Sequence, residues 1–334
     1  MANSTGNTLF SCLLAAFSCI SFAKATSAQS TATAEPPAAE QKLEATEVET
    51  KTAAKSEAAS EPEKATTDKP SKPKLPEFMR VAEKDGKPQA LQTAVAKYHL
   101  ADSDSAEPIE VTLIGAVHIG EATYYSRLNQ LFRQYDSLLF EMVMDPEMGM
   151  PDPNEESRGL SPVSTIQVGM KTALNLAFQL DEINYKAKNF VHADMTPQEF
   201  FDCMEKRKEG VMSMFFRSLG ASLAQQSSGQ ANDIEVLSAM VSGNPIALRR
   251  SFAQQMEMAD GQMAALTGKD GKSVLITERN AAAFEVLRSE LDDGKKKIGV
   301  FYGAGHLKDM HERLLKDFDM ELVEIDWLDA WNLQ

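Results

Sequence analysis

The sequence predicts an α/β fold: a mixed central sheet built from two βαβ-like halves, with a Met-rich helical insertion at about 145–260 between them. Two apolar runs rich in β-branched and aromatic residues, 109–114 and 298–302, have the length of core strands. Each run leads into the tetrapeptide Gly-x-x-His and then into an amphipathic stretch typical of a helix. The same strand–turn–helix unit therefore occurs near both ends of the folded region, which predicts the two halves.

The chain begins with features of an export signal. Residues 9–23 form an apolar block that is too short to span a bilayer comfortably. Small residues follow it, in Ala23-Lys24-Ala25 or in Thr26-Ser27-Ala28, so residues 1–28 are predicted to be a signal peptide. We expect an exported protein, periplasmic or secreted, with no stable membrane span after cleavage. No Lys or Arg precedes the block, which leaves an uncleaved N-terminal anchor open.

A linker and one domain are expected after the signal. Residues 29–75 consist mainly of Ala, Glu, Lys, Thr, Ser and Pro, with almost no large apolar side chains. Such a segment cannot bury enough surface to offset its ordering entropy, so it is predicted to be disordered, with a solvated helix as the alternative. The remaining residues, 76–334, are enough for one domain with a full core.

Charge and cysteine content exclude several classes of protein. The net charge of −15 argues against a nucleic-acid partner. Of the three cysteines, Cys12 and Cys19 lie in the apolar block, which leaves Cys203 alone in the domain. The sequence therefore predicts neither a disulfide framework nor a Cys-rich zinc site.

The first half of the domain is predicted as a hairpin followed by a βαβ unit. A partly alternating stretch and a strongly apolar one enclose a turn-rich segment, and apolar residues at helical spacing come next. A helix between two strands predicts a right-handed crossover. The expected elements are strands at 91–100 and 109–114, a helix at 121–135 and a core strand at 137–143.

The insertion and the second half follow. Residues 144–162 are rich in Pro, Asp and Met and are expected to be irregular, and the many Met residues of the insertion are more often adaptable core filler than a binding surface. Within the insertion we expect helices at 163–180, 197–208, 211–226, 233–242 and 245–259 and a short strand within 185–195. The second half is predicted as a helix at 272–291, a strand at 297–302, a helix at 307–318 and a strand at 321–325.

The two tetrapeptides, Gly115-Ala116-Val117-His118 and Gly303-Ala304-Gly305-His306, carry the first candidate site residues. If their strands are parallel, His118 and His306 lie along the edge at which open α/β sheets bind ligands. Two converging imidazoles are the beginning of a metal site. The alternative is that each histidine is satisfied locally at an ordinary glycine-rich turn.

Glu141 is the third candidate, because it interrupts an apolar strand. A buried carboxylate is costly unless it is paired or bound to a metal. Its place near the end of the strand puts it at the same edge as His118. Glu141 is therefore a candidate metal ligand, or a general base with a raised pKa. The alternative is an exposed position on an edge strand.

Arg279 and Asn280 form a polar pair on the helix before the second tetrapeptide. Asn280 lies on the apolar stripe of this helix, so it needs a hydrogen-bond partner inside the protein. Arg279 is a candidate for stabilising anionic charge, unless it pairs on the surface with Glu278 or Glu285.

Three further sets of residues were considered. Gly303 and Gly305 expose backbone N–H groups at a helix N-terminus, where they are candidates for binding an oxyanion. His192 and Asp194 alternate on the expected short strand, as a ligand with its supporting group or as a buried structural pair. His311, on a polar helix face, and His99, on the hairpin, carry no chemistry in this scheme.

The ordered set of a Gly-x-x-His, Glu141, the Arg279-Asn280 pair and a second Gly-x-x-His resembles the TraB/GumN family, to which the animal Tiki proteins also belong. Order and spacing agree from about 91 to 325, whereas the middle, about 145–260, does not match residue by residue. The resemblance implies a peptidase that depends on a divalent metal, Mn²⁺ or Co²⁺, and acts outside the membrane. The wider fold group also resembles erythromycin esterases and ChaN-like haem-binding proteins, so the fold alone does not determine the chemistry.

These observations lead to a first hypothesis, an exported metal-dependent hydrolase, most consistent with a peptidase, that acts on a peptide or small-molecule substrate. His118, Glu141 and His306 would hold the ion, whose bound water would be activated. Glu141, Arg279 and Asn280 would be the catalytic groups. The alternatives are a non-catalytic haem- or metal-binding protein of the same fold and a hydrolase of esters or lactones.

Overall fold

A computed structural model describes residues 75–101, 108–149, 174–207, 243–260 and 272–334. The predicted signal peptide and nearly all of the predicted linker lie outside these residues, as do the helices expected at 211–226 and 233–242 and most of the one at 163–180. Within the described part of the chain, no helix is both long enough and apolar enough to cross a membrane.

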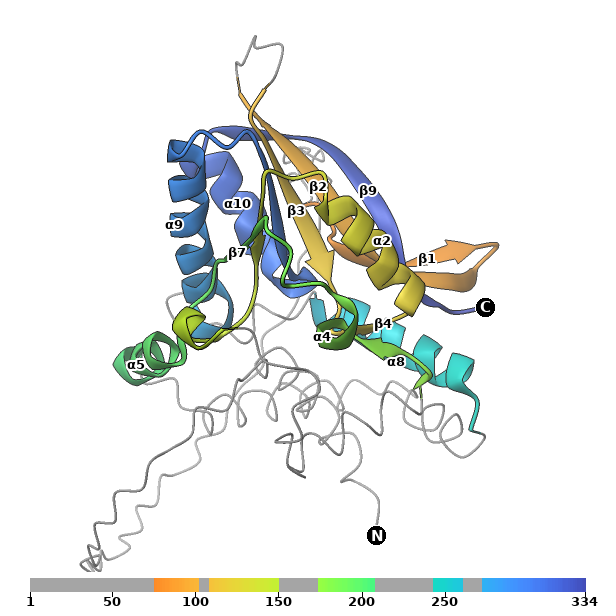
Figure 1. Ribbon diagram of the computed structural model, residues 1–334. Helices are drawn as coiled ribbons and strands as arrows, with labels where there is room; N and C mark the ends of the chain where they lie inside the picture. The colour runs from red at the N-terminus through yellow and green to blue at the C-terminus, as the bar shows by residue number, and fades with distance from the viewer. Residues whose placement is uncertain (1–74, 102–107, 150–173, 208–242, 261–271) are drawn as a thin grey trace, which may run out of the picture. The chain divides into compact units, whose positions relative to one another are not determined.

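A mixed sheet forms the centre of the domain (Figure 1). Strand β2 bonds β9 along one edge, and along its other edge it bonds first β1 and then β3. The sheet continues from β3 through β8 and β5 to β7, and these four strands are parallel. The bounds are β1 Met79–Lys84, β2 Lys87–Leu100, β3 Glu110–Ala116, β5 Ser137–Phe140, β7 Phe190–His192, β8 Lys297–Gly303 and β9 Met320–Asn332. A separate pair consists of β4 (Ile119–Gly120) and β6 (Ala177–Phe178).

Helices cover both faces of the sheet (Figure 1). Leu138 on β5 belongs to the core beneath α2 and α8, whereas the adjacent Leu139 belongs to the core beneath α9 and α10. Successive residues of a strand point to opposite faces, so strands covered on both sides are apolar throughout. The helices are α2 (Ala122–Phe132), α4 (Gln179–Glu182), α5 (Pro197–Arg207), α8 (Pro245–Asp260), α9 (Arg279–Asp292) and α10 (Leu307–Asp317). Shorter helical turns are η1 (Pro146–Met148), η3 (Val274–Glu278) and η4 (Ala304–His306).

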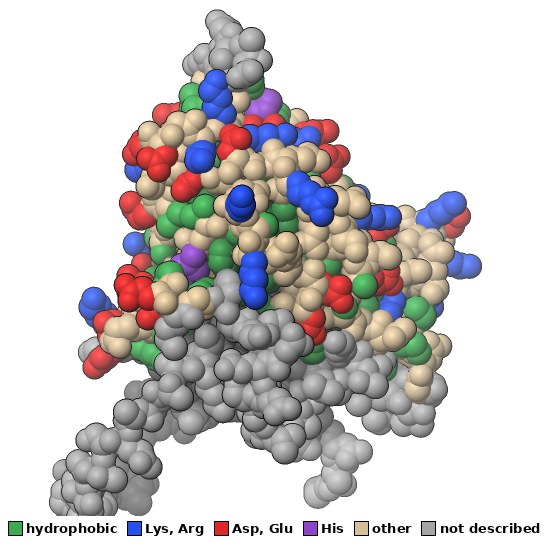
Figure 2. All heavy atoms as spheres, viewed as in Figure 1, with side chains coloured by type: hydrophobic (Ala, Val, Ile, Leu, Met, Phe, Trp, Pro, Cys, Tyr) green, Lys and Arg blue, Asp and Glu red, His purple; other side chains and the backbone are tan. Residues whose placement is uncertain are grey.

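The predicted α/β class is confirmed, and so is the hairpin, because β2 and β3 pair antiparallel from Val95 opposite Ile114 to His99 opposite Glu110. The expected final strand was too short. Strand β9 runs for 13 residues because it follows the 14-residue β2 along most of its length. On the face seen in Figure 2, acidic and basic side chains are interspersed, with apolar side chains between them.

Two sequence expectations require correction. The strand predicted at 137–143 ends at Phe140, where its pairing with both neighbouring strands also ends, so Glu141 lies just beyond the strand rather than inside it. The helix expected at 163–180 does not reach its predicted end. The end of the helix expected at 163–180 is strand β6, because pairing with β4 prevails over local helix propensity. The short strand expected within 185–195 is β7, which pairs with β5.

Candidate functional site

The two Gly-x-x-His segments leave the sheet side by side. Strands β3 and β8 are parallel neighbours, with Gly115 opposite Tyr302 and Ala116 opposite Gly303. Both tetrapeptides therefore follow the same edge of the sheet, as the sequence predicted. Gly115 also has a packing role, because a Cβ there would lie 3.2 Å from Leu307 Cδ2. A glycine at this position lets α10 approach the end of β3 closely.

Two tyrosines of α2 hold the loop that carries His118. The Tyr124 hydroxyl donates to the Gly115 carbonyl at 3.0 Å, and the Tyr125 hydroxyl donates to the Val117 carbonyl at 2.9 Å. Both tyrosines are fully buried. Burial lowers the pKa of His118, although the negative charge of Glu141 opposes this effect. His118 is half-buried and neutral at physiological pH.

His306 is completely buried, and its ring orientation is determined by Asn280. The Asn280 Nδ2 group donates to the His306 carbonyl at 3.1 Å and to Asp309 Oδ2 at 2.9 Å. Asn280 Oδ1 is thus left to accept, and it lies 2.7 Å from His306 Nδ1, which must carry the proton. Burial lowers the pKa of His306 to about 4, so the ring is neutral and its Nε2 is unprotonated.

The unprotonated Nε2 of His306 faces a carboxylate. It has no hydrogen-bond partner and lies 3.5 Å from Glu141 Oε1. Both atoms are acceptors, so Glu141 cannot satisfy the ring nitrogen, which has no donor among the described residues. Two ligand atoms that are each about 2.1 Å from one ion in tetrahedral coordination lie about 3.4 Å apart. The spacing of His306 Nε2 and Glu141 Oε1 therefore fits a shared divalent cation.

Glu141 is held by contacts from two other segments. Its Oε2 accepts the Gly303 N–H at 2.7 Å, and its Oε1 accepts from Arg279 Nη2 at 2.8 Å. Burial alone would raise the pKa of Glu141, but the charge of Arg279, together with the two histidines and the Gly303 N–H, lowers it to about 2. The expectation of a general base with a raised pKa is therefore wrong, because a buried guanidinium lies against this carboxylate.

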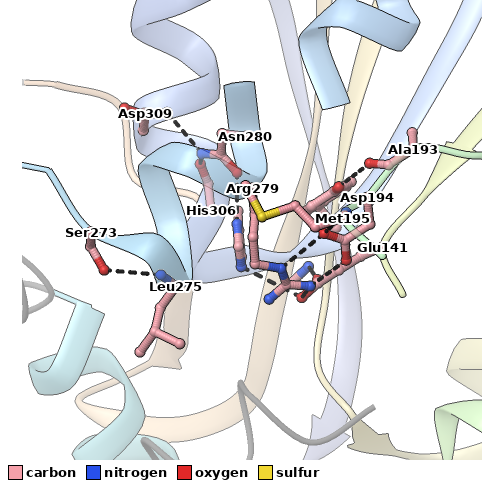
Figure 3. Close-up of polar contacts among 12 residues, drawn as sticks. Glu141, Ala193, Asp194, Met195, Ser273, Leu275, Arg279, Asn280, His306 and Asp309 are labelled. Carbon is pink, nitrogen blue, oxygen red and sulfur yellow. Dashed lines mark hydrogen bonds and ion pairs between the residues drawn. The ribbon is translucent and has the colours of Figure 1, made fainter. Parts of the chain in front are cut away.

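Arg279 lies between two carboxylates (Figure 3). Its Nε and Nη2 donate to the two oxygens of Asp194 at 3.0 and 2.5 Å, and Nη2 also contacts Glu141. Burial raises the pKa of Asp194, and Arg279 opposes that rise. The hydrogen bonds to Asp194 come from N–H groups, including the backbone of Met195, so this carboxylate is also ionised. Pairing of Arg279 with Glu278 or Glu285 on the surface is excluded, since Arg279 is 2% exposed.

A π-helical turn brings Arg279 and Asn280 into place. The turn η3 immediately precedes α9, and Ser273 accepts the Leu275 N–H at its start (Figure 3). A turn of this kind contains an extra residue relative to an α-helix and is frequent at functional sites. Here Arg279 turns toward Asp194 and Glu141, while the next residue, Asn280, turns toward His306.

Counted over the described residues, the charges of this cluster do not balance. Glu141 and Asp194 carry two negative charges and Arg279 carries one positive charge, while His118 and His306 are neutral. The cluster has a net charge of −1 in buried surroundings, where an uncompensated charge is costly. A bound cation would supply positive charge to this cluster. Among the described residues, however, no group of three or more His, Cys, Asp or Glu side chains is arranged as a metal site.

Other sequence candidates lie elsewhere or are already engaged. His192 Nε2 contacts the Met142 carbonyl at 2.7 Å, so His192 supports the backbone after Glu141 and Asp194 is the member of the pair that reaches the cluster. The Gly303 N–H is bonded to Glu141, which excludes it from binding an oxyanion in this arrangement. Gly305 lies in the η4 turn, and its oxyanion role stays a prediction.

Several residues that complete the site were not predicted from the sequence. Asp309 orients Asn280 and is itself held by Arg313 Nε at 2.7 Å. The Tyr302 hydroxyl donates to the carbonyl of Ala193, and its ring packs edge-on against His306. Of the two tyrosines of α2, Tyr124 lies on the apolar stripe that the sequence indicates, but hydrophobic spacing does not show that its hydroxyl group bonds a loop.

His311 lies outside the cluster and corrects one expectation. It is 5% exposed, although a polar helix face was predicted. Its Nδ1 lies 2.9 Å from the Tyr98 hydroxyl, and its ring also packs against Phe78. Burial lowers the pKa of His311, which Glu312 on the same helix opposes. The long final strand and β2 bring Tyr98 beneath α10 and so cover this histidine.

The fold and the cluster together define an α/β protein with a buried, negatively charged His–Glu–Arg–Asp constellation at the ends of parallel strands. A scan against protein-family models, a search of curated proteins and a search of solved structures each found no match to the chain. The resemblance to the TraB/GumN family stays a prediction from the sequence.

Proposed function

We propose that the protein is an exported metal-dependent hydrolase, a peptidase of the kind that the TraB/GumN resemblance implies, with a divalent cation at the Glu141–His306 pair. One observation carries the proposal: a buried, unprotonated ring nitrogen faces a buried carboxylate oxygen at 3.5 Å, and neither has a proton to share. A cation between them would give the ring nitrogen a partner and would offset the excess negative charge of the cluster.

His306, Glu141 and His118 are the residues that would hold the ion, which would supply Lewis acidity and an activated water when bound. Mn²⁺ or Co²⁺ is favoured by the resemblance. Glu141 would act as a ligand rather than as a base, because a carboxylate with a pKa of about 2 accepts a proton only weakly at neutral pH. Arg279 and the Gly303 N–H each hold one oxygen of this carboxylate and so prevent its rotation. Asn280 maintains the His306 tautomer that presents a lone pair.

The same geometry weighs against the haem-binding alternative at His306. Haem iron binds the free nitrogen of a histidine ring, and at His306 that nitrogen faces Glu141 at 3.5 Å. A porphyrin needs an open face on that side. Hydrolysis of an ester or lactone would use the same groups. It is distinguished from peptide hydrolysis by measuring turnover on both classes of substrate.

The test uses the full chain after removal of metal with a chelator. Co²⁺ is titrated and followed by its visible absorption, and turnover is measured on a fluorogenic peptide library and on an ester panel. We expect one ion per chain, and peptide turnover that the chelator stops and Mn²⁺ or Co²⁺ restores. Glu141→Gln should fold but bind Co²⁺ at least about tenfold more weakly and lose turnover.

The matched control is Glu110→Gln. Glu110 begins β3, at the far end of this strand from His118, and contacts Lys297 at 3.8 Å. This variant should bind Co²⁺ as the unchanged protein does. A folded Glu141→Gln variant with full Co²⁺ affinity and full turnover would show that the proposed ion site is wrong.

A further inference from the structure

Two buried side-chain atoms of the described residues lack a hydrogen-bond partner: His306 Nε2 and Gln179 Oε1. The first is explained by a cation shared with Glu141. The second is unexplained, although Gln179 is only 7% exposed. Native proteins rarely leave a buried amide oxygen without a donor, so the surroundings of Gln179 indicate what it serves.

Gln179 is attached directly to the first Gly-x-x-His segment. It follows β6, which pairs with β4 immediately after His118. Its backbone N–H donates to the His118 carbonyl at 2.9 Å. This bond and the short β4–β6 pair hold Gln179 beside His118, although 60 residues of sequence and much of the insertion separate them.

The side-chain amide of Gln179 is oriented by a buried phenol. Gln179 Nε2 donates to the Tyr185 hydroxyl at 2.8 Å, and Tyr185 is 8% exposed. Because the NH₂ group of Gln179 is bonded to Tyr185, Oε1 is the side-chain atom that is free to accept a hydrogen bond from the His118 ring. Burial lowers the pKa of His118, and the Gln179 side chain opposes this decrease, as an acceptor near the ring would. Gln179 Oε1 itself makes no hydrogen bond in the structure.

The second histidine shows the completed form of this arrangement. Asn280 contacts both the backbone carbonyl and the ring of His306, and its NH₂ group is held by Asp309. Gln179 contacts the backbone carbonyl of His118, and its NH₂ group is held by Tyr185. In both places the carboxamide nitrogen is engaged, but only the Asn280 oxygen has an imidazole partner, whereas the oxygen of Gln179 has no partner.

We propose that Gln179 is the positioning residue of His118: its Oε1 accepts the ring N–H and so selects the tautomer whose second nitrogen presents a lone pair to the site. This inference rests on the proposed function, for which His118 must be a neutral ligand. A carboxamide suits the task better than a carboxylate would, because it orients the ring without adding negative charge to a cluster that already carries an excess.

The test measures the tautomer of the His118 ring directly and does not depend on enzymatic turnover. The full chain is labelled with ¹⁵N-histidine, and long-range ¹H–¹⁵N spectra distinguish the two neutral tautomers. The chain has five histidines, so the signals are assignable by single substitution. The spectra are recorded on the metal-free protein at about pH 7.5, where a histidine with a lowered pKa is neutral. His118 should show one neutral tautomer, and Gln179→Met should convert it to a mixture of both.

Tyr185→Phe provides a second variant that preserves shape. It removes only the hydroxyl that anchors the Gln179 amide, so it should produce a partial mixture of tautomers at His118 even if Gln179→Met fails to fold. His311, held by Tyr98 and outside the cluster, is the internal control, and its signals should not change in either variant. A single unchanged His118 tautomer in whichever of these variants folds would overturn the proposal.

A parallel Co²⁺ titration separates this inference from the proposed function. Gln179→Met should weaken Co²⁺ binding about 10–100-fold, the usual effect of losing the group that orients a histidine ligand. If the unchanged protein binds no Co²⁺, the proposed function fails while the tautomer result stands by itself. If Co²⁺ binds and Gln179→Met leaves the His118 tautomer unchanged, only the positioning role is refuted.

Discussion

Replacing Arg279 by methionine tests the buried ion cluster most directly. The Arg279 side chain is 3% exposed, and it contacts Asp194, 0% exposed, at 2.5 Å and Glu141, 8% exposed, at 2.8 Å. Methionine keeps much of the apolar stem but leaves both carboxylates without their cation. At an effective dielectric constant of about 20, each such contact is worth roughly 4 kcal/mol. Breaking a buried pair costs about 3–5 kcal/mol because a charge is left uncompensated.

We therefore expect Arg279→Met to lower the free energy of unfolding by about 4 kcal/mol at pH 7. The assay is urea unfolding followed by circular dichroism and by the fluorescence of the two tryptophans, Trp327 and Trp331, both on β9. The matched control is Arg288→Met on the same helix. Arg288 is exposed and stacks over Phe318 at 4.6 Å, so its loss should cost less than about 1 kcal/mol.

The pH dependence of this loss has a defined sign. Without Arg279, burial raises the folded-state pKa of Glu141 and Asp194 above the unfolded value, so protonation favours the folded state. A group of this kind contributes stability at low pH and loses it as the pH rises. The deficit of Arg279→Met should therefore shrink between pH 7 and pH 5, and adding Asp194→Asn should recover part of it at pH 7. A deficit below about 1 kcal/mol at pH 7, or one independent of pH, would refute the buried-charge argument.

The remaining predictions concern the fold. Gly299→Ala should destabilise the domain by about 1–3 kcal/mol in urea unfolding, because the new Cβ would lie 2.6 Å from Leu138 Cδ1; an unchanged midpoint would contradict the close packing of β8 against β5. Because burial lowers the pKa of His311, as it does for His118 and His306, stability should fall as the pH drops below about 6.5; His311→Gln should remove part of this dependence and His99→Gln should leave it unchanged. The fragment 76–334 should melt at the same temperature as the longer chain in calorimetry, and a clear decrease would show that earlier residues pack on the domain.

Local pattern was enough for much of the fold. The strands at 109–114 and 298–302 and the helices after them were predicted from apolar spacing, because residues covered on both faces must be apolar throughout. Asn280 was predicted to need an internal partner because it lies on an apolar helix stripe, and His306 is that partner. In each case the signal lies within one element, where hydrophobic periodicity is informative.

Pairing between distant segments was decided only by the tertiary structure. The sequence by itself determined the α/β class, the two Gly-x-x-His turns and the polar residues that would be costly to bury alone. It did not determine that Asp194 would meet Arg279, 85 residues away, or that Gln179 would lie beside His118. The charge state of Glu141 also depended on the fold, since burial raises its pKa and the guanidinium of Arg279, brought from α9, contributes to a larger opposing decrease. The sequence shows which ionisable and polar groups the protein has. Their protonation states and partners depend on distances between atoms, which are determined only when the chain is folded.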